Sequence, residues 1–364
     1  MVERFLKQTV FTSQEDYIKN MHINVPENFN FAYDVVDAWA AKEPDKLAML
    51  WTNDEGAEQR YTFADIKEQS DRVASFFLQL GIKRGDCVMM MLKRRVEFWF
   101  TIVALHKIGA VAIPATHLLT PKDLIYRNNS AGIRMIVTAD DKLIMQHVED
   151  SLEQSPTVEF IVSTGAEVSG KWISMAKGKE NAPQFVRPEV VNTNSDISLL
   201  YFTSGSSGQP KMVAHNFLYP LGHIVTAKYW HNVDPNGLHF TISDTGWGKA
   251  LWGKLYGQWL CEAGVFTYDF DRFVADDILK LIGKHKITTF CAPPTMYRFF
   301  IKEDLSKYDL SSIQYATTAG EALNPEVFNQ FKKATGLTIM EGFGQTETTL
   351  SIANFVGSKP KIGS

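Results

Sequence analysis

Short apolar runs alternate with helix-like stretches along most of this chain, and the alternation limits the folds open to it. Residues 87–92 form a continuous apolar run, as in a strand buried on both faces. A helical pattern follows over residues 96–108, and the next apolar run begins at Val111. Strands that alternate with helices predict parallel sheets joined by right-handed crossovers. The sequence therefore predicts an α/β fold with mainly parallel sheets flanked by helices.

A polar stretch rich in Lys, Glu and Pro, residues 163–194, separates two such alternating regions. We expect a Rossmann-like α/β subdomain on each side of it. The predicted organisation is a surface arm over residues 1–30, a first subdomain over 31–175, a second over 190–350, and the start of a small β subdomain over 351–364.

Composition narrows the classes of function. The chain is 45% hydrophobic over 364 residues, which is enough for a large buried core. Its net charge of −4 gives no electrostatic case for binding nucleic acid or an anionic membrane surface. Cys87, Cys261 and Cys291 lie far apart, so we expect neither a disulfide framework nor a thiolate metal site. We see no signal peptide and no membrane span in the sequence, and we expect a cytoplasmic protein.

The stretch from Tyr201 to Lys211 has the composition of a phosphate-binding loop. Glycines allow turns that bring backbone N–H groups near an anion, while hydroxyls and a lysine add donors and positive charge. The stretch lies between two apolar runs, so we expect a loop between buried strands. It lacks the Walker A spacing, and the alternative is a Ser/Gly-rich surface loop. The candidate phosphate-binding residues are Thr203, Ser204, Gly205, Ser206, Ser207, Gly208 and Lys211.

A second polar motif follows the last long apolar run, at a place where α/β sheets gather ligands. Phe343 can stack on a flat base, Thr346 can donate to a phosphate oxygen, and Glu347 can hold Mg²⁺. The same pattern is also typical of a plain turn. The residues of this motif that could lie beside a base or phosphate are Glu341, Gly342, Phe343, Gly344, Gln345 and Thr346. By themselves, residues 318–322 indicate a strand end that leads into a helix, and only the family resemblance given below adds Gly320, Glu321 and Ala322 to these base-side residues.

Two further features concern pockets and metals. Residues 241–247 run from a predicted strand into Ser-Asp-Thr-Gly-Trp, which favours a pocket wall at Trp247, although a tryptophan is otherwise most often part of a core. Four histidines stand at eight-residue spacing: His215, His223, His231 and His239. A predicted strand and a Pro/Gly turn interrupt the series, so one helix cannot carry it. We interpret the spacing as coincidence rather than as a metal site.

The motifs together resemble one family. Residues 203–211 resemble the phosphate-binding signature of adenylate-forming (AMP-binding) enzymes, which include acyl-CoA synthetases, peptide-synthetase adenylation domains and luciferases. Residues 341–348 resemble the second signature of that family, and residues 241–247 resemble the acetyl- and medium-chain acyl-CoA synthetases. The resemblance implies a ligase of fatty acid metabolism. Such an enzyme uses ATP and Mg²⁺ to activate a short-chain, medium-chain or aromatic carboxylic acid as an acyl-adenylate, and transfers the acyl group to coenzyme A.

The resemblance also implies a role for each candidate residue. Lys211 and Thr346 would be catalytic, with the first loop on the β- and γ-phosphates and Thr346 on the α-phosphate. The base-side residues would hold adenine, Glu347 would hold the metal, and Trp247 would line the acyl pocket. Phosphoryl transfer needs mostly positioning and neutralised charge, which these residue types supply.

The sequence departs from the family pattern in two respects. The aromatic residue of the second signature is usually tyrosine, and Phe343 retains stacking but loses the phenol hydrogen bond. Family members continue beyond this signature with a ribose-binding aspartate and a small C-terminal domain that carries a catalytic lysine, none of which can be assigned here. We therefore expect a large N-terminal domain that is inactive alone. Two alternatives stay open: a nucleotide- or acyl-binding module without turnover, and a peptide-synthetase-type adenylation domain, which residues 241–247 disfavour.

Overall fold

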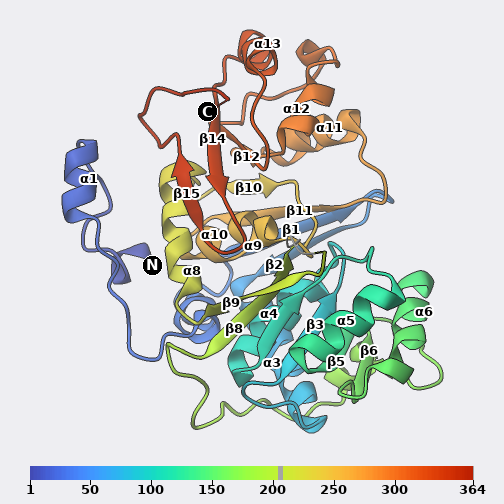
Figure 1. Cartoon of the computed structure of the whole chain (residues 1–364). Helices are drawn as coiled ribbons and strands as arrows, with labels where there is room; N and C mark the ends of the chain where they lie inside the picture. The colour runs from blue at the N-terminus through green and yellow to red at the C-terminus, as the bar shows by residue number, and fades with distance from the viewer. Residues whose placement is uncertain (204–207, 364) are drawn as a thin grey trace.

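The computed structural model describes residues 1–203 and 208–363, which form two sheets flanked by helices (Figure 1). The first sheet has seven strands, and all neighbouring pairs are parallel except β8 and β9. In spatial order its strands are β7 (Ile173–Ser174), β6 (Phe160–Ser163), β5 (Ile133–Thr138), β3 (Cys87–Met91), β4 (Val111–Pro114), β8 (Ile197–Thr203) and β9 (Lys211–Asn216).

The second sheet has eight strands and the same character. Its pairs are parallel except at the two edges, where β14 pairs with β15 and β1 pairs with β2 in antiparallel fashion. In spatial order its strands are β15 (Leu350–Ala353), β14 (Ile339–Gly344), β13 (Tyr315–Ala319), β12 (Thr289–Cys291), β10 (Leu238–Thr241), β11 (Gly264–Asp269), β1 (Leu47–Asn53) and β2 (Glu58–Thr62). The prediction of an α/β fold with two mainly parallel sheets is confirmed.

Helices cover the sheets, and capping boxes begin two of them. Thr62 and Asp65 form a capping box at the start of α3, and Thr120 and Asp123 form another at α5. Around the first sheet lie α3 (Phe63–Gln79), α4 (Glu97–Ile108), α5 (Pro121–Ala131), α6 (Lys142–Ser151) and α7 (Met175–Glu180). The others are α1 (Gln14–Asn20), α2 (Ala38–Lys42), α8 (Tyr219–Ile224), α9 (Gly248–Lys254), α10 (Tyr256–Leu260), α11 (Ala275–His285), α12 (Pro294–Phe300) and α13 (Pro325–Thr335).

The sheets do not divide the chain at the expected junction. β1 and β2 precede every strand of the first sheet, yet they extend the second sheet beside β11. β8 and β9 were expected in the second subdomain, but β8 lies parallel to β4 in the first sheet, where its apolar residues are buried. The polar stretch after β6 carries β7 and α7 rather than a break. β15, expected to open a new β subdomain, instead pairs with β14.

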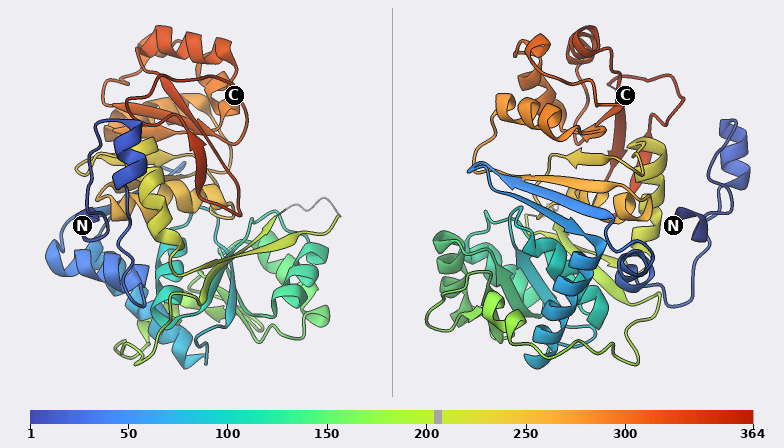
Figure 2. Two further views of the ribbon diagram at one scale, coloured as in Figure 1. Left: turned by 60° about the vertical axis from the view of Figure 1, so that its left-hand side comes forward. Right: turned by 180° about the vertical axis from the view of Figure 1, so that it is seen from behind.

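Buried tryptophans join the two units, which lie one above the other in both views of Figure 2. Trp39 Nε1 donates to the carbonyl of Trp259 at 3.0 Å, and Trp99 Nε1 donates to the carbonyl of Lys254 at 2.7 Å. Trp259 Nε1 in turn donates to the carbonyl of Ala48 at 3.0 Å. All three rings are fully buried. Because each ring bridges segments that are distant in sequence, the two units share one hydrophobic core.

The N-terminal arm does not merely lie on the surface, contrary to expectation: Phe5, Leu6 and Phe29 are buried, although α1 buries no residue and lies along the outside (Figure 2). The stretch after Trp247 forms two short helices, because the backbone at Leu255 (φ −150°, ψ −84°) leaves the helical region between α9 and α10.

Candidate active site

Two edge hairpins carry the two signature motifs. In the first, β8 and β9 pair antiparallel with Thr203 opposite Lys211, so these residues close the Ser/Gly loop at its base. Ser204, Gly205, Ser206 and Ser207 lie outside the described residues. Gly208 has φ +87°, a conformation that other residue types adopt only with strain. β8 is buried as predicted, but β9 is a largely exposed edge strand, with Lys211 in solvent.

The second hairpin, β14 and β15, brings the base-side segments together. β13 and β14 are parallel, with Ala319 opposite Gly342. The segments that follow them, which begin at Gly320 and Phe343, therefore lie at the same edge of the sheet. The Phe343 ring is 53% exposed, so its face is accessible for stacking. The sequence-predicted base-side residues thus form one surface.

A hydrogen bond joins the two hairpins. His215 Nε2, on β9, donates to the carbonyl of Thr346 at 2.6 Å. Burial lowers the pKa of His215, partly offset by this hydrogen bond and by the charge of Glu347. Lys211 lies four residues before His215 on the same strand, about 13 Å away. The structure therefore places the lysine end of the first loop and the Thr346–Glu347 turn on one side of the molecule.

Trp247 lies where the two sheets approach each other. It precedes α9 and is 60% exposed, so it is not a core residue. The backbone before it packs closely on the first sheet, since a Cβ at Gly246 would meet the backbone of Thr116. Gly248 lies beside the Tyr201 ring, and Lys249 Nζ donates to the carbonyl of Ala319 at 2.9 Å. Trp247 is thus held between the phosphate-loop strand and the base-side strand.

Two carboxylates of the predicted base site accept hydrogen bonds from backbone N–H groups. Glu321 Oε1 accepts from the backbone N–H of Thr295 at 2.9 Å. Glu341 accepts from the N–H of Leu323 at 2.8 Å and from that of Gly363 at 2.6 Å. Both therefore shape the loops at this edge of the sheet through main-chain contacts.

Sequence reasoning missed the buried Lys254, and it gave Lys249, which is half-buried, only a minor place as a pocket-lining residue. Burial lowers the pKa of Lys249, and it lowers that of Lys254 to about 7. Lys254 Nζ donates to the carbonyl of Ser243 at 2.8 Å, at the start of the segment that leads to Trp247. The available signal was a pair of lysines inside an otherwise apolar helical stretch, because such residues are buried only when a polar group satisfies them.

Most of the histidine series consists of buried, hydrogen-bonded side chains. His223, His231 and His239 are buried and bond to Thr226, Gln258 and Thr289 respectively. Within residues 1–203 and 208–363, no three His, Cys, Asp or Glu side chains gather in a geometry that could hold a metal ion. Glu347 is an exposed carboxylate on the turn after β14. Its role as a metal ligand stays a prediction.

The fold and the paired hairpins define a class: an α/β protein of two mainly parallel sheets with a Ser/Gly/Lys loop and an aromatic-Gly-Gln-Thr-Glu loop on one side. A family model described as "AMP-binding enzyme" matches residues 36–364, and the chain belongs to this family. The family prediction made from the motifs is confirmed.

Named relatives agree with this assignment. The chain is 34% identical to human "Acyl-coenzyme A synthetase ACSM3, mitochondrial", with 97% of this chain and 61% of the relative covered. It is 36% identical to rat "Acyl-coenzyme A synthetase ACSM5, mitochondrial", with 93% and 59% covered. It therefore spans about three-fifths of the length of these relatives. The expectation of a cytoplasmic location is wrong, because these relatives are named as mitochondrial.

Solved structures show the same fold. The anthranilate CoA ligase AuaEII, solved with anthranoyl-AMP, superposes with a TM-score of 0.84 at 24% identity, with 92% of this chain and 64% of that one covered. The *Brucella canis* acyl-CoA synthetase superposes with a TM-score of 0.82 at 22% identity, with 92% and 60% covered. Among the helices of the described residues, none is long and apolar enough to cross a membrane.

Proposed function

We propose that this chain is the nucleotide-binding part of an AMP-forming acyl-CoA synthetase, which joins a carboxylic acid to coenzyme A through an acyl-adenylate. The observation that carries the proposal is the His215–Thr346 hydrogen bond, which joins the strand that carries Lys211 to the turn that carries Thr346 and Glu347. A triphosphate that lies between them would meet Lys211 from one loop and Thr346 from the other. The relatives named as acyl-CoA synthetases and the ligase solved with an acyl-AMP support the same reaction.

Mg²⁺ fits the donor set on this side of the molecule. The ion is commonly held by one or two carboxylates together with phosphate oxygens of the substrate. Glu347 offers one exposed carboxylate on the turn that also carries Thr346. The metal would supply charge neutralisation at the phosphates. Lys211, Thr346 and backbone N–H groups of the loops would orient the triphosphate and donate hydrogen bonds to it.

Adenylate formation tests this proposal directly. We expect Lys211→Ala and Glu347→Gln to lower acid-dependent ATP–pyrophosphate exchange about 100-fold or more in a version extended to the length of the relatives, because each removes a charge at the phosphates. Calorimetry with Mg-ATP on the 364-residue chain tests binding alone. Lys333→Ala and Glu303→Gln, at exposed sites elsewhere in the second unit, are matched controls. Wild-type exchange in both site variants would remove the phosphate and metal roles.

The acid is proposed to lie beside Trp247 and to be a short-chain, medium-chain or aromatic acid. The exposed indole lies between the phosphate-loop strand and the base-side strand. An acyl group joined to the α-phosphate would extend towards this position. Trp247→Gly is expected to shift the preferred acid towards larger members of a series from acetate to octanoate and benzoate. One methylene of fit is worth about 1–3 kcal/mol. An unchanged order of preference would show that Trp247 does not line the acyl pocket.

A further inference from the structure

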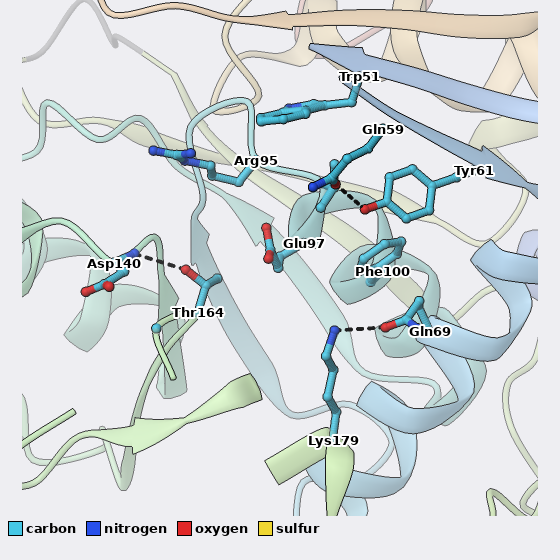
Figure 3. Close-up of a pocket in the computed structure, with 12 residues that line it drawn as sticks. Trp51, Gln59, Tyr61, Gln69, Arg95, Glu97, Phe100, Asp140, Thr164 and Lys179 are labelled. Atoms are coloured by element: carbon cyan, nitrogen blue, oxygen red, sulfur yellow. Dashed lines mark hydrogen bonds between the residues drawn. The ribbon is translucent and has the colours of Figure 1, made fainter. Parts of the chain in front are cut away.

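A cavity of about 590 Å³ is lined by residues outside the signature hairpins (Figure 3). Its walls come from β1, β2, α3, α4 and α7 and from the turns after β3, β5 and β6. None of the residues assigned above to ATP, metal or acid lines it. Small-molecule sites typically measure about 300–1,000 Å³, so this cavity has the size of a ligand site.

The cavity occupies a place in the first sheet where ligands often bind. β3 lies between β4 and β5, so the chain leaves β3 towards one edge of the sheet and leaves β5 towards the other. Open α/β sheets form crevices at the carboxyl ends of strands at such reversals. Arg95 follows β3, Asp140 follows β5 and Thr164 follows β6, and all three line the cavity.

Two opposite charges face this space without being paired to each other. Within the described residues, no ion pair is recorded for Glu97 or Lys179; Lys179 Nζ donates to Gln69 Oε1 at 2.8 Å. Figure 3 shows the Glu97 carboxylate pointing into the middle of the cavity, with Lys179 on the opposite side from Trp51 and Arg95. Burial raises the pKa of Glu97 and lowers that of Lys179, as expected for charges that lack a close partner.

Aromatic rings form the rest of the wall, and neighbouring groups fix them in place. Trp51 Nε1 donates to the carbonyl of Arg94 at 2.9 Å. Tyr61 donates to Gln59 Oε1 at 2.5 Å, and its ring meets that of Phe100 edge-on with centroids 5.4 Å apart. Fixed aromatic faces bind flat or apolar groups, and they also attract an ammonium ion.

We propose that this cavity binds a zwitterion of the aromatic amino-acid class, either free or as a short peptide. Its ammonium group meets Glu97, its carboxylate meets Lys179, and its ring lies against Trp51, Tyr61 and Phe100. Arg95, on the other side of the cavity, is paired with Asp269 at 3.2 Å. A ligand with a single charge would leave the opposite protein charge buried without compensation, which is costly. The inference does not depend on the proposed synthetase reaction, because it concerns a different set of residues.

Calorimetry on the 364-residue chain tests the charge requirement with four probes that share one ring: L-phenylalanine, L-phenylalanyl-L-phenylalanine, 3-phenylpropionate and 2-phenylethylamine. We expect at least one of the two zwitterions to bind about tenfold more tightly than both single-charge probes. The amino acid and the dipeptide distinguish the two sources of the ligand. Failure of both zwitterions to bind at about 10 mM, or equal binding of all four probes, would overturn the proposal.

Two variants assign the charges. Glu97→Gln is expected to weaken the zwitterion and 2-phenylethylamine while sparing 3-phenylpropionate, and Lys179→Gln is expected to do the reverse for the two single-charge probes. Lys177→Gln, on the same helix and exposed, is the matched control. If one variant fails to fold, the other variant and the wild-type series still decide. Binding unaffected by the site variants, or displaced by ATP or coenzyme A, would contradict a separate site.

Discussion

The two hairpins that carry the signature loops share a layout but differ in what lies beneath them. In β8–β9, a Cβ added to Gly208, just before β9, would meet no described heavy atom within 4 Å. β14–β15 lies on a layer of buried rings, where a Cβ at Gly342 would lie 2.5 Å from the Trp230 ring and one at Gly344 would collide with Trp252. Glycine therefore allows a positive φ in the first hairpin, and it leaves room for the packed rings in the second.

Acidification should have the largest effect, because the core contains buried histidines and two of them touch the ring layer under β14–β15: His223 beside Trp252 and His231 beside Trp230. Burial lowers the pKa of His106, His223 and His239 to about 3. The unfolded chain, with histidine pKa values near 6.5, binds more protons below that pH, so stability is lost as the pH falls from about 6.5. At about pH 5.5 each histidine contributes a loss of about 1.4 kcal/mol, or about 4 kcal/mol together.

The measurement is urea unfolding at several pH values between 7 and 5.5. His223 lies beside Trp252, the ring under Gly344. Because the buried His231 contributes as well, His223→Gln should reduce the pH dependence by about one quarter. A stability that stays constant over this range would show that these side chains are not buried as neutral imidazoles. Hydrogen exchange then tells the hairpins apart: β14–β15 should lose protection before β8.

Overpacking of the second hairpin gives the next largest effect. Gly342→Ala pushes a methyl group into Trp230, whose Nε1 donates to the carbonyl of Met340 at 3.2 Å and so resists displacement. We expect a loss of about 1–3 kcal/mol in the free energy of unfolding, measured by urea denaturation. In the double variant with Trp230→Phe, the smaller ring should recover part of that loss. Additive effects of the two substitutions would mean that the ring and the glycine are not in contact.

How far the sequence predicts this molecule depends on whether a feature is local. Strand and helix patterns, such as those of residues 87–92 and 96–108, are local, and the sequence predicts them. The pairing of β1 with β11 and of β8 with β4 joins distant segments, and no local pattern encodes the partner. The same distinction holds at the site. The motif compositions identified the loops, but the ring under Gly344 and the bond from Lys249 to Ala319 exist only after folding.

Loss of the hydrogen bond between the two hairpins is expected to lower the free energy of unfolding by an intermediate amount. His215→Ala removes the hydrogen bond to Thr346 and the stacked contact with Tyr219, whose ring centroid lies 3.8 Å away. We expect a loss of about 1 kcal/mol in stability, because the side chain is only half-buried. Hydrogen exchange should rise in the turn over residues 345–349 and stay constant in β12. Unchanged exchange in that turn would show that only the buried rings beneath β14–β15 hold the second loop in place.

The smallest effect on stability is expected at Gly208, and it makes the comparison sharpest. Gly208→Ala places a side chain at φ +87°, which costs about 1–2 kcal/mol in the folded loop. The same substitution restricts the unfolded chain and returns about 0.4–1 kcal/mol, and no described neighbour is displaced. The net change in the free energy of unfolding should stay within about 1 kcal/mol, below that of Gly342→Ala.

Mg-ATP affinity should fall nonetheless, because a loop that relieves the strain no longer holds its N–H groups towards the phosphates. For both glycine variants, calorimetry measures the affinity for Mg-ATP and urea unfolding measures the free energy of unfolding. A stability loss at Gly208 as large as that at Gly342 would mean that both glycines serve packing.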